Sequence, residues 1–321
     1  MIRILKKIKS IVAITLLIPA IGFATQSEKK ADDVLRIGYQ KYGTLILLKA
    51  SGELEKRLAP LGVKVTWNEF PAGPQLLEGL NVGSIDFGTV GETPPIFAQA
   101  ANAKITYIGY KPASPKSEAI IVQKDSSIKS VADLKGKKVV LNKGSNVHYL
   151  LVKALENAGL KYSDVETVFL APADARAAFE RGSVDAWVIW DPFLAAAETS
   201  IGAKVLKDGT NTVNNHQFYL AEESYASKRA DVVAIIFEEL KKVNDWAISK
   251  PKEVANALAP LTGLDVVTLE KALSRGGYGI NYLNNNVITE QQKIADTFYD
   301  LKLIPKKIDI KSVVWLPEQK K

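Results

Sequence analysis

Two stretches of the sequence share a pattern that decides the fold. Residues 70–95 read FPAGPQLLEGLNVGSIDFGTVGETPP, and residues 171–193 read APADARAAFERGSVDAWVIWDPF. Each stretch begins with a Pro-Ala pair, continues through a helix-like segment, and ends that segment at Gly-Ser-(Ile/Val)-Asp. Glycine ends the predicted helix, and the apolar residues after it predict a strand that runs into an acidic residue and proline. The pattern predicts the same helix–strand unit in two halves of the chain.

The segments around these stretches extend the repeat. In the first half, strand-like segments at Val34–Tyr39, Val63–Phe70, Ile85–Val90 and Ile105–Tyr110 alternate with helix-like segments at Leu45–Leu58, Pro74–Leu80 and Pro94–Ala101. In the second half, strand-like segments at Lys138–Leu141, Val165–Leu170, Val184–Trp190 and Ala203–Leu206 alternate with helix-like segments at Val147–Ala158, Ala175–Arg181 and Pro192–Ala197. This alternation predicts an α/β protein with two lobes, each a mainly parallel sheet flanked by helices.

The pattern changes after residue 218, where helix-like segments dominate. They lie at Asp231–Ser249, Pro251–Leu261, Asp265–Leu273 and Glu290–Leu301. A return of the chain to the first lobe explains this change, with crossings near Ser117–Ile120 and Asn215–Tyr219. We therefore expect lobe one at 25–117 plus 219–321 and lobe two at 118–218, hinged around a central cleft.

The first 24 residues have the features of a secretory signal peptide. Four basic residues precede an apolar run from Ile11 to Ile21, and small residues follow up to Ala24. The run is too short to span a membrane, and the alternative is a retained amphipathic anchor. We expect cleavage near Ala24 and export to the periplasm.

Composition excludes several classes of function. Without the four basic residues of the leader, the 42 basic and 35 acidic residues leave a net charge of +3, so neither nucleic acid nor a membrane surface is an expected partner. The chain has no cysteine, which excludes a lipid anchor and cysteine-based zinc, haem or protease chemistry. No cofactor and no metal are predicted.

The loop at residues 142–148, NKGSNVH, is the most informative candidate site. In a parallel α/β sheet, ligands bind beyond the carboxyl ends of the strands, where such loops lie. Ser145 is a suitable helix N-cap, and the free N–H groups of the first turn then form an anion site. The alternative is an ordinary cap satisfied by its own serine. The candidate ligand-binding residues of this loop are Asn142, Ser145, Asn146, Val147 and His148.

Two loops of the first half offer further donors. The Thr93 hydroxyl and the backbone amides of Gly91, Glu92 and Thr93 could contact an anion, because the next two residues are prolines without N–H groups. The Glu92 side chain would face away or pair across the cleft, or it forms a structural salt bridge. Gln40 could donate its amide to an oxyanion, or it lies in a solvated loop.

Three further side chains have competing interpretations. Trp190 could cover the apolar tail of a ligand at the cleft mouth, or it could belong to the core. The core interpretation fits Trp187 better. His148 could bind an anion, cap its helix or pack. Arg176 is by default a surface residue of a helix. With no Gly-x-Ser-x-Gly elbow, no cysteine and one histidine near the cleft, the chain is not expected to be an enzyme.

Many segments together resemble the periplasmic aliphatic sulfonate-binding proteins of ABC importers. They are Arg36–Lys41, Glu69–Gln75, Leu80–Asp86, Pro94–Ala100, Val131–Gly136, Lys143–Ser145, Pro172–Phe179, Val184–Trp187, Trp190–Pro192, Phe298–Tyr299 and Pro305–Lys307. The resemblance spans nearly the whole mature chain, and the Glu92–Pro95 and Lys143–Ser145 loops are its most specific parts. The segments Tyr42–Leu48 and Arg275–Gly279 differ from the family pattern.

The resemblance implies a Venus-flytrap fold that captures alkanesulfonates and delivers them to a membrane permease and its ATPase for sulfur acquisition. A sulfonate is a permanent anion with three acceptor oxygens, so it needs donors and no proton transfer. The nearest relatives of this family bind taurine, nitrate, bicarbonate or thiamine precursors, and these stay as alternative ligands. A monomer is expected.

Overall fold

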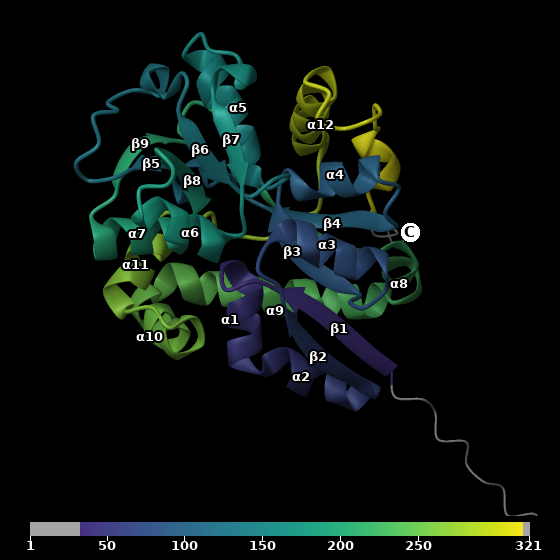
Figure 1. Cartoon of the computed structure of the whole chain (residues 1–321). Coiled ribbons are helices and arrows are strands. Elements are labelled where there is room, and N and C mark those ends of the chain that lie inside the picture. Colours follow the sequence, from purple (N-terminus) through teal and green to yellow (C-terminus); the bar gives the residue numbers. More distant parts are fainter. Residues whose placement is uncertain (1–32, 317–321) are drawn as a thin grey trace, which may run out of the picture. The chain divides into compact units, whose positions relative to one another are not determined.

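The structure, a computed structural model, describes residues 33–316. The predicted signal peptide lies outside the described residues. Figure 1 shows two groups of strands, each with its own helices. They are two five-stranded sheets with the orders β2-β1-β3-β10-β4 and β7-β6-β8-β5-β9.

The first sheet takes its strands from both ends of the described chain. Its strands are β1 (Asp33–Tyr39), β2 (Val63–Glu69), β3 (Phe87–Gly91), β4 (Ile105–Lys111) and β10 (Gln217–Glu222). Strand β1 pairs in parallel with β2 and β3. Strand β10 lies between β3 and β4 and runs antiparallel to both. Four strands therefore share one direction, and the fifth opposes them.

The second sheet has the same arrangement. Its strands are β5 (Glu118–Val122), β6 (Lys138–Leu141), β7 (Glu166–Phe169), β8 (Ala186–Trp190) and β9 (Lys204–Asp208). Strand β6 pairs in parallel with β7 and β8, whereas β5 is antiparallel to β8 and β9. Each antiparallel strand is the first strand after the chain crosses from one sheet to the other. Strand β5 follows the crossing from the first sheet to the second, and β10 follows the crossing back. The predicted α/β architecture with mainly parallel sheets is confirmed, with one antiparallel strand added to each sheet.

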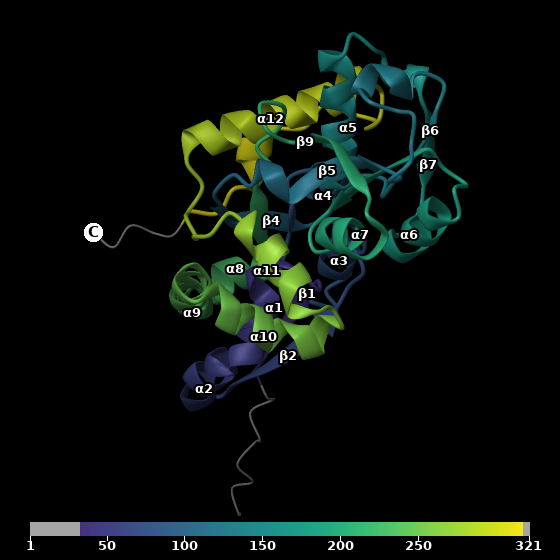
Figure 2. The same ribbon diagram turned by 90° about the vertical axis from the view of Figure 1, so that its left-hand side faces the viewer.

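Helices cover both faces of the first sheet. One face packs against α1 (Gly43–Ser51), α2 (Glu53–Leu58), α8 (Glu223–Lys228), α9 (Ala230–Ser249), α10 (Pro251–Thr262) and α11 (Val266–Ser274). The other face packs against α3 (Gly73–Asn81), α4 (Pro94–Ala100) and α12 (Asn285–Asp300), and Figures 1 and 2 both show α12 beside α4. Strands β3, β10 and β4 are accordingly buried along nearly their whole length, whereas the edge strand β2 is partly exposed along most of its length.

The second sheet has its own core and its own helices. These helices are α5 (Asn146–Asn157), α6 (Pro172–Glu180) and α7 (Phe193–Ile201). Short 3-10 helices lie at Ala59–Leu61, Pro115–Ser117, Val131–Leu134, Tyr162–Asp164 and Ile310–Val313. Helix α11 contacts α7, so the part of the chain that returns to the first sheet also reaches the second.

The aspartate of the repeated motif has the same contact in both halves. Asp86 accepts a hydrogen bond from the backbone N–H of Arg36 in β1 at 2.8 Å and donates its own N–H to the Arg36 carbonyl at 2.7 Å. Asp185 makes the same two contacts with Lys138 of β6, both at 2.8 Å. The motif thus fixes the start of the third strand of each half against its first strand, which explains why the sequence repeats there.

Some predicted elements differ from the structure. The helix predicted at Leu45–Leu58 is two helices, because Gly52 between them takes a left-handed conformation with φ 65°. Strands β5 and β10 and helix α8 were not predicted. Both strands lie where the sequence indicated crossings, and the predicted change to helices after residue 218 begins only after β10 ends at Glu222.

Replacing the motif aspartate should destabilise the first sheet more than the second. Asp86 is buried and also accepts from the Arg36 guanidinium, so Asp86→Ala leaves several part-buried donors of Arg36 without their partner. We expect a loss of about 2 to 3 kcal/mol in the free energy of unfolding, measured by urea denaturation. Asp185→Ala is the matched control, and its less buried contact should lose clearly less. Equal losses in the two variants would contradict this account.

Candidate functional site

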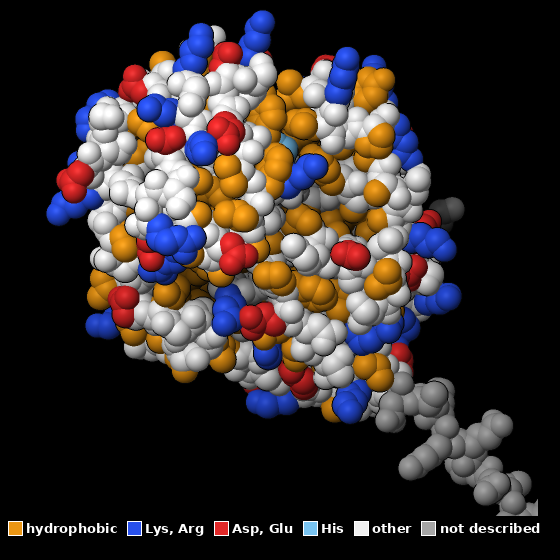
Figure 3. Space-filling model, viewed as in Figure 1, with side chains coloured by type: hydrophobic (Ala, Val, Ile, Leu, Met, Phe, Trp, Pro, Cys, Tyr) orange, Lys and Arg blue, Asp and Glu red, His pale blue; other side chains and the backbone are white. Residues whose placement is uncertain are grey.

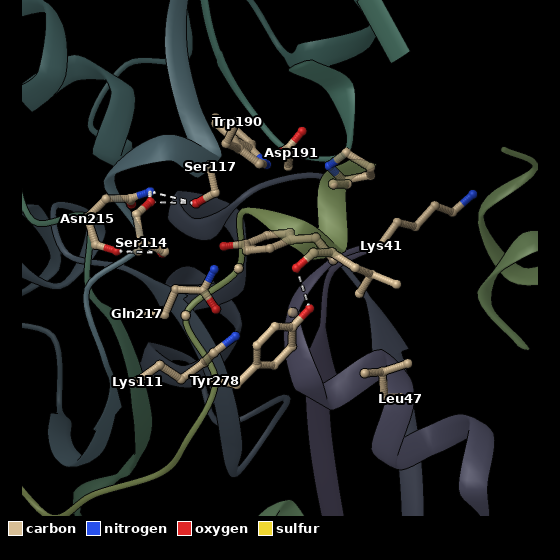
Figure 4. Close-up of a pocket in the computed structure, with 18 of the residues that line it drawn as sticks. Lys41, Leu47, Lys111, Ser114, Ser117, Trp190, Asp191, Asn215, Gln217 and Tyr278 are labelled. Carbon is tan, nitrogen blue, oxygen red and sulfur yellow. Dashed lines mark hydrogen bonds between the residues drawn. The ribbon is translucent and has the colours of Figure 1, made fainter. Parts of the chain in front are cut away.

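A cavity of about 80 Å³ lies where strand ends from both sheets meet the crossing segments (Figure 4). Residues at strand ends and helix starts that line it are Lys41, Tyr42, Gly43, Gly91, Asn146, Trp190, Asp191 and Pro192. Residues of the crossing segments and the strand ends beside them are Lys111, Ser114, Ser117, Asn215 and Gln217. Residues of α1, α10, α11 and the segment after α11 are Leu47, Leu258, Leu269, Ala272, Leu273, Gly276, Gly277 and Tyr278.

The two crossing segments are joined by Asn215. Its side-chain amide donates to the Ser114 carbonyl and to the Ser117 hydroxyl, both at 3.0 Å. Its side-chain oxygen accepts from the amide of Asn146, the first residue of α5, at 3.1 Å. Figure 4 shows Asn215, Ser114 and Ser117 grouped on one side of the cavity. This side is therefore a wall of ordered polar groups that belong to both sheets.

Two buried carboxyl groups lie behind this polar wall. Glu118 accepts from the Asn146 amide, and burial, with Glu92 nearby, raises its pKa well above the usual range. Glu92 accepts from the backbone N–H of His216 at 2.9 Å, and burial raises its pKa to about 8. At neutral pH the protonated form of Glu92 therefore predominates, and the raised pKa of Glu118 favours its neutral form as well.

The charge on the polar wall comes from Lys111, the last residue of β4. It is 5% exposed, and burial lowers its pKa to about 8. Its ammonium nitrogen lies 5.7 Å from the centre of the Tyr278 ring. In the antiparallel pair of β4 and β10, Lys111 is opposite Gln217, and Figure 4 shows both side chains extending from the same wall.

Two helices begin at the cavity. Helix α1 starts at Gly43 and α5 at Asn146, and both residues line the cavity. Ser145 occupies the N-cap position of α5, but its hydroxyl donates to the Asn142 carbonyl at 2.7 Å and does not cap the helix. This side chain therefore leaves the first-turn N–H groups of α5 uncapped, although the His148 N–H donates to the Ser145 carbonyl at 2.9 Å. The positive end of the helix lies at the cavity, because Asn146 lines it.

The opposite side of the cavity is apolar. Leucines from α1, α10 and α11 form it, and Trp190 lies at its edge. Trp190 is 5% exposed and packs in the core of the second sheet, and its indole N–H has no hydrogen-bond partner within residues 33–316. It thus combines a core position with an available donor at the cavity. Trp187 lies wholly in that core.

An ion cluster next to the cavity joins the end of α11 to the second sheet and α7. Arg275, just after α11, pairs with Asp191 at 3.5 Å and with Glu198 of α7. Lys271 of α11 also pairs with Glu198, at 3.1 Å. Burial raises the pKa of Asp191 to about 7, against the effect of Arg275. These contacts hold α11 against the second sheet.

This geometry can be compared with known proteins. The NMT1/THI5-like family model matches residues 60–254. The crystal structure of the periplasmic aliphatic sulphonate binding protein SsuA from Escherichia coli is 46% identical, with a TM-score of 0.82 over 90% of this chain and 94% of that one. The chain belongs to the NMT1/THI5-like family and, within it, to the aliphatic sulfonate-binding proteins.

Other relatives extend this comparison. The alkanesulfonate-binding protein SsuA from Xanthomonas axonopodis pv. citri, solved bound to MOPS, is 40% identical with a TM-score of 0.83, over 88% of this chain and 98% of that one. The taurine-binding periplasmic protein of Escherichia coli is 29% identical over 73% of this chain and 72% of its own. The desulfurization enzyme DSZB, 16% identical with a TM-score of 0.64 over 89% of this chain and 97% of that one, shares the fold alone.

Three of the residues predicted to bind a ligand line the cavity: Gly91, Asn146 and Trp190. The other seven lie away from its lining. Gln40 donates to the Thr89 carbonyl at 3.2 Å, and Asn142 to the Leu170 carbonyl at 3.5 Å.

Thr93 and Val147 are fully buried, and the Glu92 carboxyl is bonded to a backbone N–H and forms no salt bridge with another described residue. Arg176 pairs with Glu180 on its own helix.

His148 packs between aromatic rings and does not line the cavity. It is fully buried, bonds to the Tyr162 hydroxyl at 2.7 Å, and lies against Phe97 and Phe298 with ring centres 6.2 and 5.3 Å away. Burial, followed by the nearby charge of Lys143, lowers its pKa to about 4, so it is neutral at physiological pH. Its place corresponds to the packing interpretation of the sequence.

Sequence reasoning missed the cavity residues contributed by the crossings and by α10 and α11. The available signal was a lysine that directly follows an apolar strand, at YIGYK in residues 107–111.

Other properties of the described residues limit what the site can hold. Within residues 33–316, no helix is both long and apolar enough to cross a membrane. In the same range, no three histidine, aspartate or glutamate side chains are grouped to hold a metal ion. On the face drawn in Figure 3, basic and acidic side chains are interspersed with hydrophobic ones, without a large patch of one sign.

Glu92 should make the stability of the protein depend on pH. Its pKa is raised from 4.5 to about 8, so the folded state holds its proton more tightly, and stability is lost as the pH rises through that interval. Glu92→Gln keeps an acceptor for His216 but cannot ionise. We expect urea denaturation to show a shallower loss of stability with rising pH in this variant than in the wild type.

The exposed Glu253→Gln is the control for this comparison and should follow the wild type. Parallel curves for Glu92→Gln and the wild type would show that this carboxyl does not titrate in that interval.

Proposed function

We propose that this protein is the substrate-binding component of an ABC importer, which captures aliphatic sulfonates in the cavity and delivers them to the membrane permease for sulfur acquisition. The observation that carries this proposal is the two-sided cavity. One side carries polar side chains of the crossing segments together with Lys111 and Gln217, and the other consists mainly of leucines, with Trp190 at their edge. The names of the two SsuA relatives support the same ligand class.

The chemistry of a sulfonate matches this cavity. A sulfonate carries a permanent negative charge on three acceptor oxygens. Gly43 and Asn146 bring the starts of two helices to the cavity, and Trp190 adds a free N–H group. An aliphatic tail gains stability by leaving water for the leucine wall. No proton transfer is required, so the site needs no acid–base pair, and we infer that the protein is not an enzyme.

The two sheets would form the two lobes of a clamp, with boundaries near residues 117 and 219. The crossings joined by Asn215 are then the hinge, and the cluster of Arg275, Asp191 and Glu198 stabilises the closed arrangement. A ligand that contacts both lobes favours closure, and the closed form would be recognised by the permease and its ATPase. We expect a periplasmic monomer, released by cleavage of its signal peptide near Ala24.

Ligand-dependent unfolding tests the ligand class. The mature protein is heated with methanesulfonate, longer alkanesulfonates, taurine, nitrate, bicarbonate or a thiamine precursor. A ligand at about 100 times its Kd should stabilise the fold by about 2.7 kcal/mol, and we expect this for alkanesulfonates, increasing with chain length as the leucine wall is covered. A shift with nitrate, bicarbonate or the thiamine precursor and none with sulfonates would contradict the proposed ligand class. It would remain consistent with a two-lobed binding protein.

A pair of tryptophan variants tests the cavity itself. Trp190→Leu removes the free N–H group and part of the tail contact, so the shift with the longer alkanesulfonates should shrink. Trp67→Leu is the matched control, because Trp67 packs on the first sheet and does not line the cavity. Unchanged shifts in Trp190→Leu would place the ligand elsewhere.

A further inference from the structure

Lys111 carries the one cavity-lining charge that has no ionic partner within residues 33–316. The other lysine of the lining, Lys41, is half exposed, pairs with Glu69 at 3.6 Å, and points away from the cavity in Figure 4. The lining carboxylate, Asp191, pairs with Arg275. The ammonium of Lys111 makes neither a hydrogen bond nor an ion pair in this part of the chain, and its contact with the Tyr278 ring is at 5.7 Å.

Such a group is costly for the fold. Burying an ammonium without a counter-charge costs free energy, and one cation–π contact recovers only part of that cost. The pKa of Lys111 is lowered by burial alone, which means that no carboxylate is close enough to offset the loss of water. Burial also raises the pKa of two buried carboxyls near the polar wall, that of Glu92 to about 8 and that of Glu118 well above its usual range, which favours their neutral forms. The charge of Lys111 therefore contributes nothing evident to stability, but it is well placed for an anion in the cavity.

We propose that the Lys111 ammonium binds the anionic head group of the ligand and makes the cavity selective for anions with an uncharged tail. This inference rests on the proposed function and specifies how the site achieves it. The head group lies at the polar wall beside Lys111 and Gln217, and the tail lies against the leucines of α10 and α11. A terminal ammonium on a short tail would be held near the like charge of Lys111 and against an apolar surface, so it is disfavoured.

The proposal has a consequence for the pH dependence of binding. A sulfonate stays ionised throughout the neutral and alkaline range, whereas Lys111 loses its proton as the pH passes about 8. The affinity for a sulfonate should therefore fall as the pH rises above about 8. Conversely, a bound sulfonate should raise the pKa of Lys111, because it favours the protonated form.

Other groups near Lys111 must be separated from this effect. The titratable and charged groups on the elements packed around it are Lys41, Tyr42, Glu92, Glu118, Asp191, His216, Arg275 and Tyr278. Among them Glu92 has a pKa of about 8, and its ionisation would weaken anion binding in the same direction.

Calorimetric titration with propanesulfonate, from about pH 6.5 to about pH 9.5, tests the proposal. In the wild type we expect the affinity to fall above about pH 8. Lys111→Met, which keeps the apolar stem, should bind about ten- to a hundredfold more weakly at neutral pH. It should also lose most of this fall and keep only the part that Glu92 contributes. Lys111→Arg keeps its charge in this range, so its affinity should fall much less than that of the wild type. Glu92→Gln should retain the fall.

Taurine, nearly the same size as propanesulfonate, tests the selectivity. The wild type should prefer propanesulfonate, and Lys111→Met should narrow that preference, because removal of the lysine also removes its repulsion of the terminal ammonium. Wild-type affinity and an unchanged pH profile in Lys111→Met, with the variant shown to be folded by circular dichroism, would overturn the inference. Loss of the fall in Glu92→Gln with its persistence in Lys111→Met would assign the titration to Glu92. A wild type that binds no alkanesulfonate at all would instead refute the proposed function.

Discussion

The hydrogen bonds of Asn215 are the contact on which the cavity depends. This residue takes a left-handed backbone conformation with φ 51°, which asparagine tolerates better than most residues. In that conformation its side chain bonds at once to the first crossing, at Ser114 and Ser117, and to the start of α5, at Asn146. One side chain thus sets the spacing between the two connections and the helix whose N-terminus opens on the cavity. The polar wall is ordered because its donors and acceptors already satisfy one another.

The protonation states of the ionisable groups around this wall depend on burial more than on ion pairs. Loss of water favours the neutral form of the Glu92 and Glu118 carboxyls, whereas Lys111 keeps its charge at neutral pH. The interior near the cavity is therefore positive, although it contains more acidic than basic groups. In the ion cluster between α11 and the second sheet, by contrast, Arg275 and Lys271 pair with the carboxylates of Asp191 and Glu198.

The sequence predicts what depends on local pattern and misses what depends on distant pairing. The repeat, the strand after each Gly-Ser-(Ile/Val)-Asp motif and the loop ends at Gly91, Asn146 and Trp190 all follow from short-range signals. Strands β5 and β10 do not, because a short apolar run after a crossing has the same local sequence whether it bridges two lobes or enters a sheet. Lys111 and Gln217 face the cavity together only because β4 pairs with β10 across more than a hundred residues.

The exchange of antiparallel strands between the sheets affects the order in which they can be completed during synthesis. All five strands of the second sheet lie between residues 118 and 208. The first sheet begins at residue 33 but lacks β10, the strand between β3 and β4, until residue 222 has been made. When the chain emerges N-terminus first, from a ribosome or through a translocation pore, all strands of the second sheet are therefore available before the last strand of the first sheet. The half that begins first is the half that closes last.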